Sequence, residues 1–258
     1  MRICRFKDPE TQSPAFAVIE GEKVYRLEGD LSAGNLSLER SEPSIRLAEA
    51  RLLPPVAPSK IVCVGRNYAA HARELGNEVP KQPLLFLKPP SSLVRSGESI
   101  WLPGVSNRVD YEGEIGVVVG ERLRKVSPDA ARAALVGICA ANDVTARDLQ
   151  KSDVQFTRAK GFDTFCPVGE VGPVPNDLST LRVRTLVNGE VRQDGTAADM
   201  VFDIPALVAY ISAVMTLEPG DLILTGTPEG VGTLSAGDVV EVEVVGVSRV
   251  SNPVTSEP

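Results

Sequence analysis

The sequence predicts a mostly β protein with some α-helix, folded as a roll of mixed strands with a small β appendage at its N-terminus. Two observations carry this prediction. Short runs rich in β-branched residues recur along the 258 residues, separated by turns that draw on 22 glycines and 20 prolines. Helix signals are few, so strand pairings must join distant segments, which favours a roll or barrel over an open parallel sheet.

A boundary is expected near Pro54, where three prolines fall within five positions and form a stiff connector that ends at Pro58. The preceding segment holds a few short strands, too few for an independent core. We therefore divide the chain into a small N-terminal β domain at residues 1–55 and a main domain at residues 56–258.

The strands follow from local patterns of apolar and β-branched residues. The stretch 239–245 alternates at its centre, as a half-buried strand should. Asn188-Gly189 lies between two β-rich runs and is typical of a two-residue hairpin turn. Strands are expected at residues 3–6, 16–20, 23–27, 61–64, 84–87, 112–119, 136–142, 181–187 and 239–245.

Two short helices are expected in the main domain. Ser127-Pro128 offers an N-cap and a proline at the first helical position, which predicts a helix over 129–135. Asp203-Ile204-Pro205 caps another, expected over 206–217. The polar C-terminal stretch 251–258 is expected to be frayed.

Composition excludes several classes of protein. With 27 basic and 34 acidic residues the formal net charge is −7, and no long Lys/Arg cluster is present, so nucleic-acid binding is not expected. No run reaches the ~18 apolar residues of a membrane span, and early charges interrupt any signal peptide. The four cysteines form no CxxC pair, which is typical of reduced thiols. We expect a cytoplasmic protein.

His71 is the single histidine of the sequence, so the usual histidine-based zinc and iron sites are excluded. It follows the strand 61–64 on a predicted helical turn, where Glu74, three residues on, shares its face. A carboxylate beside an imidazole orients it for work as a general base. The pattern also fits an exposed surface pair, and spacing alone leaves both interpretations open.

Three carboxylates mark a candidate metal site. Glu112 and Glu114 point to the same face of a predicted strand, where like charges repel unless a cation lies between them. Asp143 follows a strand of small residues that heads inward, and burying it is costly without compensation. Three oxygen ligands favour Mg²⁺ or Mn²⁺ over Ca²⁺. Salt-bridged structural acids are the open alternative.

Cationic and hydroxyl groups supply candidate substrate contacts. Lys160 lies in a polar loop, and Arg147, four residues after Asp143, can share a helical face with it. Each either pairs with the acids or polarises a substrate carbonyl and holds its carboxylate. The Gly/Thr loop 225–232 presents N–H groups and hydroxyls to an anion, but it lacks the Gly-Lys-Ser/Thr element of a Walker loop.

The ordered set of these motifs resembles the fumarylacetoacetate hydrolase superfamily over most of residues 60–235. The set consists of Gly65-Arg66-Asn67-Tyr68 with His71 and Glu74, Pro83–Pro89, Asp110–Glu114, Asn142–Asp148, Ala159–Asp163 and Thr225–Pro228.

The resemblance implies a β-rich roll, a homodimer, and Mg²⁺ or Mn²⁺ (with Ca²⁺ as a further candidate) held by Glu112, Glu114 and Asp143. Lys160 would act with the metal on the substrate's oxygens, and the base pair His71 and Glu74 would lie on a mobile segment with a hinge within 73–81. The residues implied to bind substrate are Arg66, Tyr68, Arg147, Gln150, Thr225, Gly226 and Thr227.

The implied activity is metal-dependent hydrolysis or decarboxylation of a C–C bond in a small 2-oxo or β-diketo carboxylic acid, as in acylpyruvate hydrolases and oxaloacetate decarboxylases. One alternative is a 2-hydroxyhepta-2,4-diene-1,7-dioate isomerase or decarboxylase of aromatic catabolism. Another is a non-catalytic binder of a metal or small ligand. The segment 1–55 is shorter than the N-terminal domain of the namesake hydrolases, which counts against a true fumarylacetoacetase.

Overall fold

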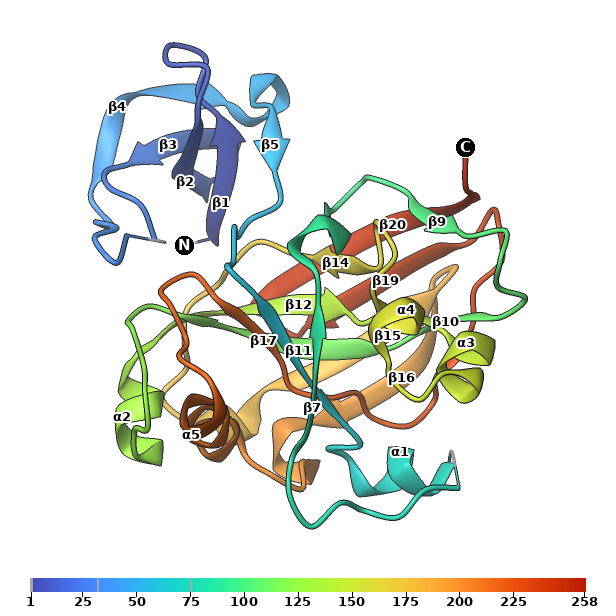
Figure 1. Ribbon diagram of the computed structural model, residues 1–258. Helices are drawn as coiled ribbons and strands as arrows, with labels where there is room; N and C mark the ends of the chain where they lie inside the picture. Colours follow the sequence, from blue (N-terminus) through green and yellow to red (C-terminus); the bar gives the residue numbers. More distant parts are fainter. Residues whose placement is uncertain (1, 32, 75) are drawn as a thin grey trace.

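The computed structural model describes residues 2–31, 33–74 and 76–258 (Figure 1). Its N-terminal part forms a separate lobe, drawn in blue at the upper left of Figure 1, around a five-stranded antiparallel sheet of order β4-β3-β2-β1-β5. These strands are β1 (Arg2–Lys7), β2 (Pro14–Glu20), β3 (Lys23–Leu27), β4 (Arg40–Arg46) and β5 (Leu52–Leu53).

A seven-stranded mixed sheet of order β7-β6-β17-β11-β12-β14-β8 forms the centre of the main body. The pairs β6/β17 and β14/β8 are parallel and the other four are antiparallel. Its strands are β6 (Ile61–Gly65), β7 (Leu84–Lys88), β8 (Leu93–Arg95), β11 (Gly113–Val119), β12 (Leu135–Asn142), β14 (Cys166–Val168) and β17 (Leu222–Leu224).

Two further sheets complete the roll. A five-stranded sheet has the order β16-β15-β19-β20-β9, and a three-stranded sheet has the order β13-β10-β18. The first contains β9 (Ile100–Leu102), β15 (Arg182–Val187), β16 (Glu190–Thr196), β19 (Val239–Val244) and β20 (Ser248–Ser256). The second contains β10 (Val109–Tyr111), β13 (Thr145–Ala146) and β18 (Gly232–Thr233).

The hairpin at Asn188-Gly189 is confirmed between β15 and β16. Asn188 and Gly189 have φ angles of 53° and 82°, the left-handed conformation that the central residues of a type I′ turn require. The twist of a type I′ turn matches the right-handed twist of the two strands that it joins. The Asn-Gly pair, which favours this turn, was therefore enough to predict the hairpin.

The helices are short. They are α1 (Ala69–Glu74), α2 (Pro128–Ala133), α3 (Arg147–Ser152), α4 (Thr157–Lys160) and α5 (Ile204–Val214), with 3-10 turns at Leu47–Glu49, Pro90–Ser92, Leu178–Thr180 and Ala197–Asp199. Both predicted N-caps are confirmed, because Ser127 accepts a hydrogen bond from the Ala130 N–H and Asp203 accepts one from the Ala206 N–H. Helix α5 ends earlier than predicted because Met215 is already extended.

The largest apolar core lies between the seven-stranded sheet, the β15/β19/β20 sheet and the buried face of α5. A second core joins the lobe to the main body, since Ile3, Phe16 and Leu27 pack in the same cluster as Cys63 and Leu222. The predicted fold class, a mostly β roll with a small N-terminal β part, is confirmed. No helix among the described residues is long and apolar enough to cross a membrane.

The expectation of a frayed C-terminal stretch at 251–258 is wrong. Ser248–Ser256 is the strand β20, which pairs antiparallel with β19 and parallel with β9. Its alternate residues Val250, Asn252 and Val254 are about 1% exposed, and the Asn252 amide donates to the Arg95 and Glu98 carbonyls. The residues between them, Ser251 and Pro253, are only half-buried, so composition alone concealed a strand whose burial alternates with period two.

Candidate active site

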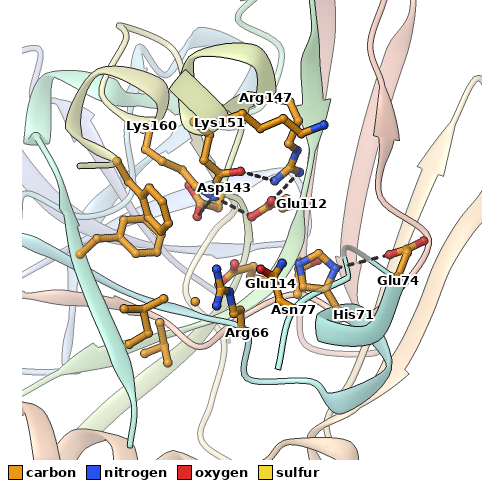
Figure 2. Close-up of a pocket in the computed structure, with 17 residues that line it drawn as sticks. Arg66, His71, Glu74, Asn77, Glu112, Glu114, Asp143, Arg147, Lys151 and Lys160 are labelled. Carbon is orange, nitrogen blue, oxygen red and sulfur yellow. Dashed lines mark hydrogen bonds and ion pairs between the residues drawn. The ribbon is translucent and has the colours of Figure 1, made fainter. Parts of the chain in front are cut away.

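A cavity of about 450 Å³ opens between α1, the starts of β7 and β11, and the helices α3 and α4 (Figure 2). One wall is polar and carries most of the predicted site residues, and the facing wall is apolar. The cavity is lined by Val64, Gly65, Arg66, His71, Glu74, Asn77, Leu84, Phe86, Glu112, Glu114, Asp143, Arg147, Gln150, Lys151, Phe156, Lys160 and Thr227.

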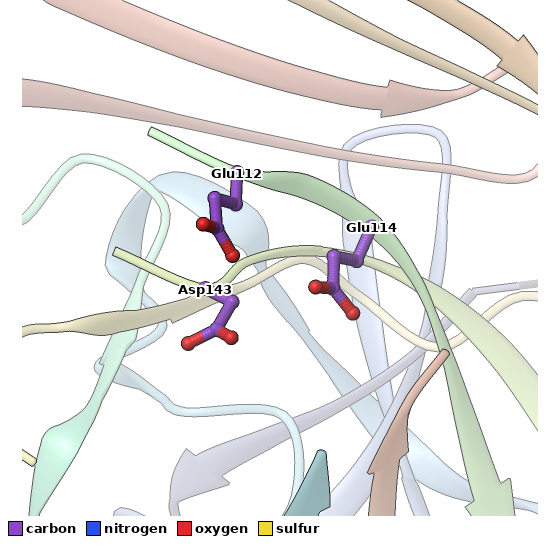
Figure 3. Close-up of side chains that lie close together, drawn as sticks. All are labelled: Glu112, Glu114 and Asp143. Atoms are coloured by element: carbon purple, nitrogen blue, oxygen red, sulfur yellow. The ribbon is translucent and has the colours of Figure 1, made fainter. Parts of the chain in front are cut away.

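The structure brings the three predicted acids together (Figure 3). Strands β11 and β12 pair so that Gly113 faces Asn142, which places the residues that flank Gly113 beside Asp143. Glu112, Glu114 and Asp143 each offer an oxygen within 4.8 Å of the others, and all three side chains are buried. Two neighbouring strand ends therefore build the cluster, as the alternation of a strand predicted for the two glutamates.

Three cationic side chains neutralise two of these acids. Lys160 Nζ donates to Glu112 Oε2 at 2.7 Å and to Asp143 Oδ2 at 2.6 Å. Lys88 Nζ donates to Asp143 Oδ1 at 2.7 Å, and Arg147 Nη2 donates to Glu112 Oε1 at 2.6 Å. Burial opposes the charge of Glu112, but Lys160 and Arg147 outweigh it and hold the pKa of Glu112 below its ordinary value.

Glu114 differs from the other two acids. It accepts the Gly226 N–H at 2.6 Å but forms no ion pair within the part of the chain that the structure describes. Burial, followed by the negative charges of Asp143 and Glu112, raises its pKa well above the ordinary value. Three cations thus face three acids at close range and their formal charges balance, but none of the three pairs with Glu114.

The lack of an ion pair at Glu114 among the described residues fits a bound divalent cation. Three buried carboxylate oxygens converge without a histidine or cysteine among them, which is the donor set that Mg²⁺ and Mn²⁺ prefer. A cation at this position would ionise Glu114 and remove the repulsion that raises its pKa. The residues that can hold it are Glu112, Glu114 and Asp143.

Each of the three guanidinium nitrogens of Arg147 donates to a protein group. Its Nε donates to Asp110 Oδ2 at 2.8 Å, its Nη1 to Gln150 Oε1 at 2.7 Å and its Nη2 to Glu112. Because the Gln150 carbonyl is occupied, its amide N–H₂ remains as the donor for a ligand in the cavity. In this arrangement Arg147 orients Glu112 and Gln150, and two of its five N–H donors, one on Nη1 and one on Nη2, remain for a substrate carboxylate.

His71 lies in the cavity wall on α1 and is 4% exposed, so the interpretation as a surface pair does not hold for His71, whereas Glu74 is exposed. His71 Nδ1 lies 3.4 Å from Glu74 Oε2 and has no hydrogen-bond partner among the described residues. The Glu74 carboxylate also accepts the Gly230 N–H at 3.0 Å. The hinge predicted within 73–81 includes Leu75, which lies outside the described residues.

Two cationic side chains of the lining, Arg66 and Lys151, form no hydrogen bond or ion pair with other described residues. Arg66 follows β6 with a φ of 58°, a left-handed conformation that turns the chain toward α1. The facing wall is apolar and includes Leu84, Phe86 and Phe156, with the two aromatic rings edge to face at 5.5 Å. The cavity therefore offers unpaired positive charge beside an apolar surface.

The loop after β17 holds the acid-bearing strand. Thr225 Oγ1 donates to the Ile115 carbonyl, the Gly226 N–H donates to Glu114, and Thr227 Oγ1 donates to the Gly113 carbonyl. Of the three predicted substrate contacts in this loop, Thr227 alone lines the cavity. Tyr68 does not line it either, because its ring is 1% exposed and packs inside the protein.

Sequence reasoning assigned no role to Lys88 and Asp110, although both lie within the quoted motifs. Lys88 is 1% exposed at the end of β7, and Asp110 is fully buried on β10, where it pairs with Arg147 and Arg108. A lysine that continues an apolar strand before two prolines, Pro89-Pro90, was the available signal. The role of Lys88 is to pair with Asp143, which lies 55 residues away in the sequence. Only the fold brings the two side chains together, so the sequence did not reveal this role.

The chain matches two family models. Residues 60–255 match the model described as fumarylacetoacetate (FAA) hydrolase C-terminal. Residues 1–55 match the model described as Rv2993c-like, N-terminal. The chain therefore belongs to the fumarylacetoacetate hydrolase family.

Similar proteins include enzymes that act on small acids. The chain is 46% identical to a mitochondrial oxaloacetate tautomerase of Arabidopsis thaliana over 74% of its length and 89% of the relative. It is 43% identical to a mitochondrial oxaloacetate decarboxylase of Dictyostelium discoideum, covering 73% of the chain and 89% of the relative. A crystal structure of 2-hydroxyhepta-2,4-diene-1,7-dioate isomerase from Mycobacterium marinum aligns with a TM-score of 0.88 at 42% identity, covering 100% and 99% of the two chains.

Proposed function

We propose that this protein is a divalent-cation-dependent enzyme of small 2-oxo dicarboxylic acids, which decarboxylates oxaloacetate or interconverts its keto and enol forms. One observation carries the proposal: within a buried cluster of three acids, Glu114 has no cationic partner among the described residues, and His71 lies in the wall of the same cavity. The similarity to an oxaloacetate tautomerase and an oxaloacetate decarboxylase supports the choice of substrate.

The charges of the cavity favour a substrate with two carboxylates. Four carboxylates and four cationic side chains line it, so its formal charge is zero, and a divalent cation would leave two positive charges. A dianionic dicarboxylate restores neutrality, whereas a monocarboxylate does not. Arg66 and Lys151 are the unpaired cations best able to hold the carboxylate remote from the metal. The eight groups are Arg66, Glu74, Glu112, Glu114, Asp143, Arg147, Lys151 and Lys160.

A bound Mg²⁺ or Mn²⁺ supplies Lewis-acid stabilisation of the negative charge that develops on the 2-oxo oxygen. The Gln150 amide, oriented by Arg147, donates a hydrogen bond to the substrate. In decarboxylation the C3–C4 bond breaks, carbon dioxide leaves, and the electron pair passes into the enolate. In tautomerisation the C3–H bond breaks instead, and its proton moves to a base.

His71 transfers the C3 proton in both versions. In tautomerisation it acts as the base that takes the C3 proton, and the enolate oxygen takes a proton from solvent to give the enol. After decarboxylation the protonated His71 acts as the acid that delivers a proton to C3, and solvent restores its proton. Glu74 faces Nδ1 and stabilises the protonated imidazole. Lys160, through its bonds to Glu112 and Asp143, keeps these carboxylates in a fixed geometry.

The test is an assay of oxaloacetate with Mg²⁺ or Mn²⁺, in which enol absorbance and pyruvate are followed separately. The wild type is expected to accelerate at least one of the two, and His71→Ala is expected to lose about 10²–10⁴-fold in kcat while it still binds Mn²⁺. If the wild type binds Mn²⁺ but turns over none of oxaloacetate, an acylpyruvate and 2-hydroxyhepta-2,4-diene-1,7-dioate, the enzyme assignment fails and the non-catalytic binder is favoured.

A second candidate is isomerisation of 2-hydroxyhepta-2,4-diene-1,7-dioate. The apolar wall and the cavity volume of about 450 Å³ favour it, since they leave room for a chain longer than a four-carbon acid. The similar structure from Mycobacterium marinum bears that name. Turnover of the dienedioate without C–C cleavage, together with no activity on oxaloacetate, would favour this alternative.

Homodimer formation and a cytoplasmic location stay predictions.

A further inference from the structure

Gln193 connects the acid-bearing strand to the loop after β17. It lies on β16, is 1% exposed and does not line the cavity. Its Oε1 accepts the Gly113 N–H at 2.9 Å, and its Nε2 donates to Thr227 Oγ1 and to the Pro228 carbonyl, both at 2.8 Å. Both N–H groups of the Gln193 amide and one lone pair of its oxygen are thus hydrogen-bonded. These bonds connect Gly113 to the loop that contains Thr227 and Pro228, two segments that are distant in sequence.

Thr227 closes a ring of hydrogen bonds. Its Oγ1 accepts from Gln193 and donates to the Gly113 carbonyl at 2.8 Å. The N–H and the C=O of Gly113 are therefore both held, one directly by Gln193 and the other through Thr227. Because the Thr227 proton is used in this ring, the hydroxyl is not free to donate to a ligand.

The position of Gly113 makes this ring relevant to the cation site. Gly113 separates Glu112 from Glu114, so holding its peptide groups fixes the relative direction of these two carboxylates. A Cβ at residue 113 would lie 1.9 Å from Thr185 Oγ1 and 3.2 Å from Gln193 Oε1. A side chain at residue 113 would therefore collide with the Thr185 side chain on β15 and crowd the Gln193 amide on β16.

The same loop contacts the helix that carries His71. Its Gly226 N–H donates to Glu114, and its Gly230 N–H donates to Glu74 on α1. Gly230 is also held through its carbonyl by the Tyr111 hydroxyl. A displacement of the loop would therefore disturb an acid of the cation cluster and the partner of the base together.

We infer that Gln193 is a positioning residue of the active site, which fixes Gly113 and the loop 226–230 so that the three acids are preorganised for a divalent cation. The inference rests on the proposed function, because it assigns Gln193 a role toward the cation that this function requires. Gln193 acts through Gly113 and Thr227 and contacts neither the cation nor the substrate.

The experiment measures Mn²⁺ affinity by titration calorimetry on folded protein, which needs no substrate. Gln193→Met and Thr227→Val each break the ring while nearly preserving side-chain size. Each is expected to weaken Mn²⁺ binding about 10-fold. This is the effect expected if the lost preorganisation of the three acids contributes about as much free energy as one buried hydrogen bond. The double variant is expected to bind no more weakly than the worse single variant, because the two residues act through one ring.

Thr185→Val is the matched control. Its hydroxyl is buried beside Gly113 but has no hydrogen-bond partner among the described residues, so its removal should leave Mn²⁺ affinity within 2-fold of the wild type. Circular dichroism confirms that every variant is folded at the titration temperature. If Gln193→Met does not fold, the Mn²⁺ affinity of Thr227→Val is compared with that of Thr185→Val, and this comparison tests the inference.

Wild-type affinity for Mn²⁺ in a ring-breaking variant overturns the inference. It is also overturned if the double variant loses the product of the two single losses, or if the wild type binds no Mn²⁺. A wild type that binds Mn²⁺ but turns over no acid overturns the proposed function alone, because the effect of Gln193 on cation affinity is measured without turnover.

Discussion

At the residue scale, the site depends on a balance of buried charges. Burial opposes the charge of Lys160, but Asp143 and Glu112 outweigh it and hold the pKa of Lys160 above its ordinary value. The ammonium is therefore a permanent positive charge between two of the three acids. Taking it away would leave Glu112 paired with Arg147 alone and Asp143 paired with Lys88 alone among the described residues. The buried cluster would then have fewer cations than acids, which costs more than the ion pair itself contributes.

We predict that Lys160→Met lowers the free energy of unfolding of the metal-free protein by about 3–5 kcal/mol, the usual cost of breaking a buried ion pair from one side. Added Mn²⁺ should then stabilise this variant more than the wild type, because the cation replaces part of the missing charge. Urea unfolding with EDTA and with Mn²⁺ measures both effects.

Lys151→Met is the control for Lys160→Met. Lys151 lines the same cavity but has no hydrogen-bond or ion-pair partner within the described ranges, so its loss should change stability by no more than about 0.5 kcal/mol. If Lys160→Met is as stable as Lys151→Met in EDTA, Lys160 does not neutralise the acids.

At the scale of elements, α1 carries the base and is tied to the rest of the site through Glu74. Its carboxylate has two partners, the Gly230 N–H and the imidazole of His71. The first bond needs only an acceptor oxygen, whereas stabilising a protonated imidazole needs a negative charge. The two roles can therefore be separated by substitution.

We predict that Glu74→Gln lowers kcat on oxaloacetate about 10–100-fold with little change in KM, because its amide oxygen still accepts from Gly230 but no charge faces His71. Glu74→Ala should also raise KM, since the link between α1 and the loop is lost. Steady-state kinetics of both variants tests this. Equal kcat and KM in the two variants would show that the Gly230 bond does not position α1.

The strand β20 gives a second prediction at this scale. It is paired on both sides and buries Val250 and Val254, so deletion of residues 248–258 should prevent folding, observed as insoluble protein or loss of the folded circular dichroism spectrum. Removing 257–258 alone takes away exposed residues and should leave the urea midpoint nearly unchanged. A soluble, cooperatively unfolding 1–247 chain would contradict the prediction.

The division into residues 1–55 and 56–258 stays a prediction about independent units. Strands β1 to β5 form their own sheet, but Ile3 pairs with Val171 and the lobe shares an apolar core with the main body. An isolated lobe would expose this shared surface.

At the scale of the whole molecule, the four thiols report on global unfolding. All are free and buried, and burial first of all raises the pKa of each. The pKa of both Cys4 and Cys166 rises from 9.0 to about 12. The folded protein thus keeps its thiols neutral at pH values where the unfolded chain ionises them.

A raised thiol pKa stabilises the fold fully below the unfolded value, and this contribution is lost as pH rises through the folded value. We therefore predict that the free energy of unfolding falls between pH 9 and 12, by roughly 1.4 kcal/mol per pH unit for each thiol that stays neutral. Urea midpoints at pH 8 and 10 test this prediction.

A thiol reagent at pH 8 supplies the check on the native state. None of the four cysteines should react before unfolding, and all four should react in urea. Rapid labelling of any cysteine in the folded protein would contradict the burial on which the pH prediction depends.

The sequence alone determined the features set by local physics. Alternating apolar residues, capping side chains and the Asn188-Gly189 turn act over a few positions, so the nine expected strands, the two helix starts and the hairpin were predictable from neighbouring residues. Glu112 and Glu114 on one strand face were predictable for the same reason, and the ordered motifs carried the family resemblance that the family model confirms.

Tertiary structure alone decided which charges meet. Lys88, Asp143 and Lys160 lie in three different segments, and Gln193 reaches Gly113 across 80 positions. Three features depend on which distant segments pack together. They are the ion pairing of each acid, the freedom of a hydroxyl such as that of Thr227 to bind a ligand, and the formation of a strand by the polar C-terminal stretch. Buried ion pairs and hydrogen bonds form only between groups that lie within a few ångströms of each other in space. The sequence gives only the separation of these groups along the chain, so it does not show which of them meet.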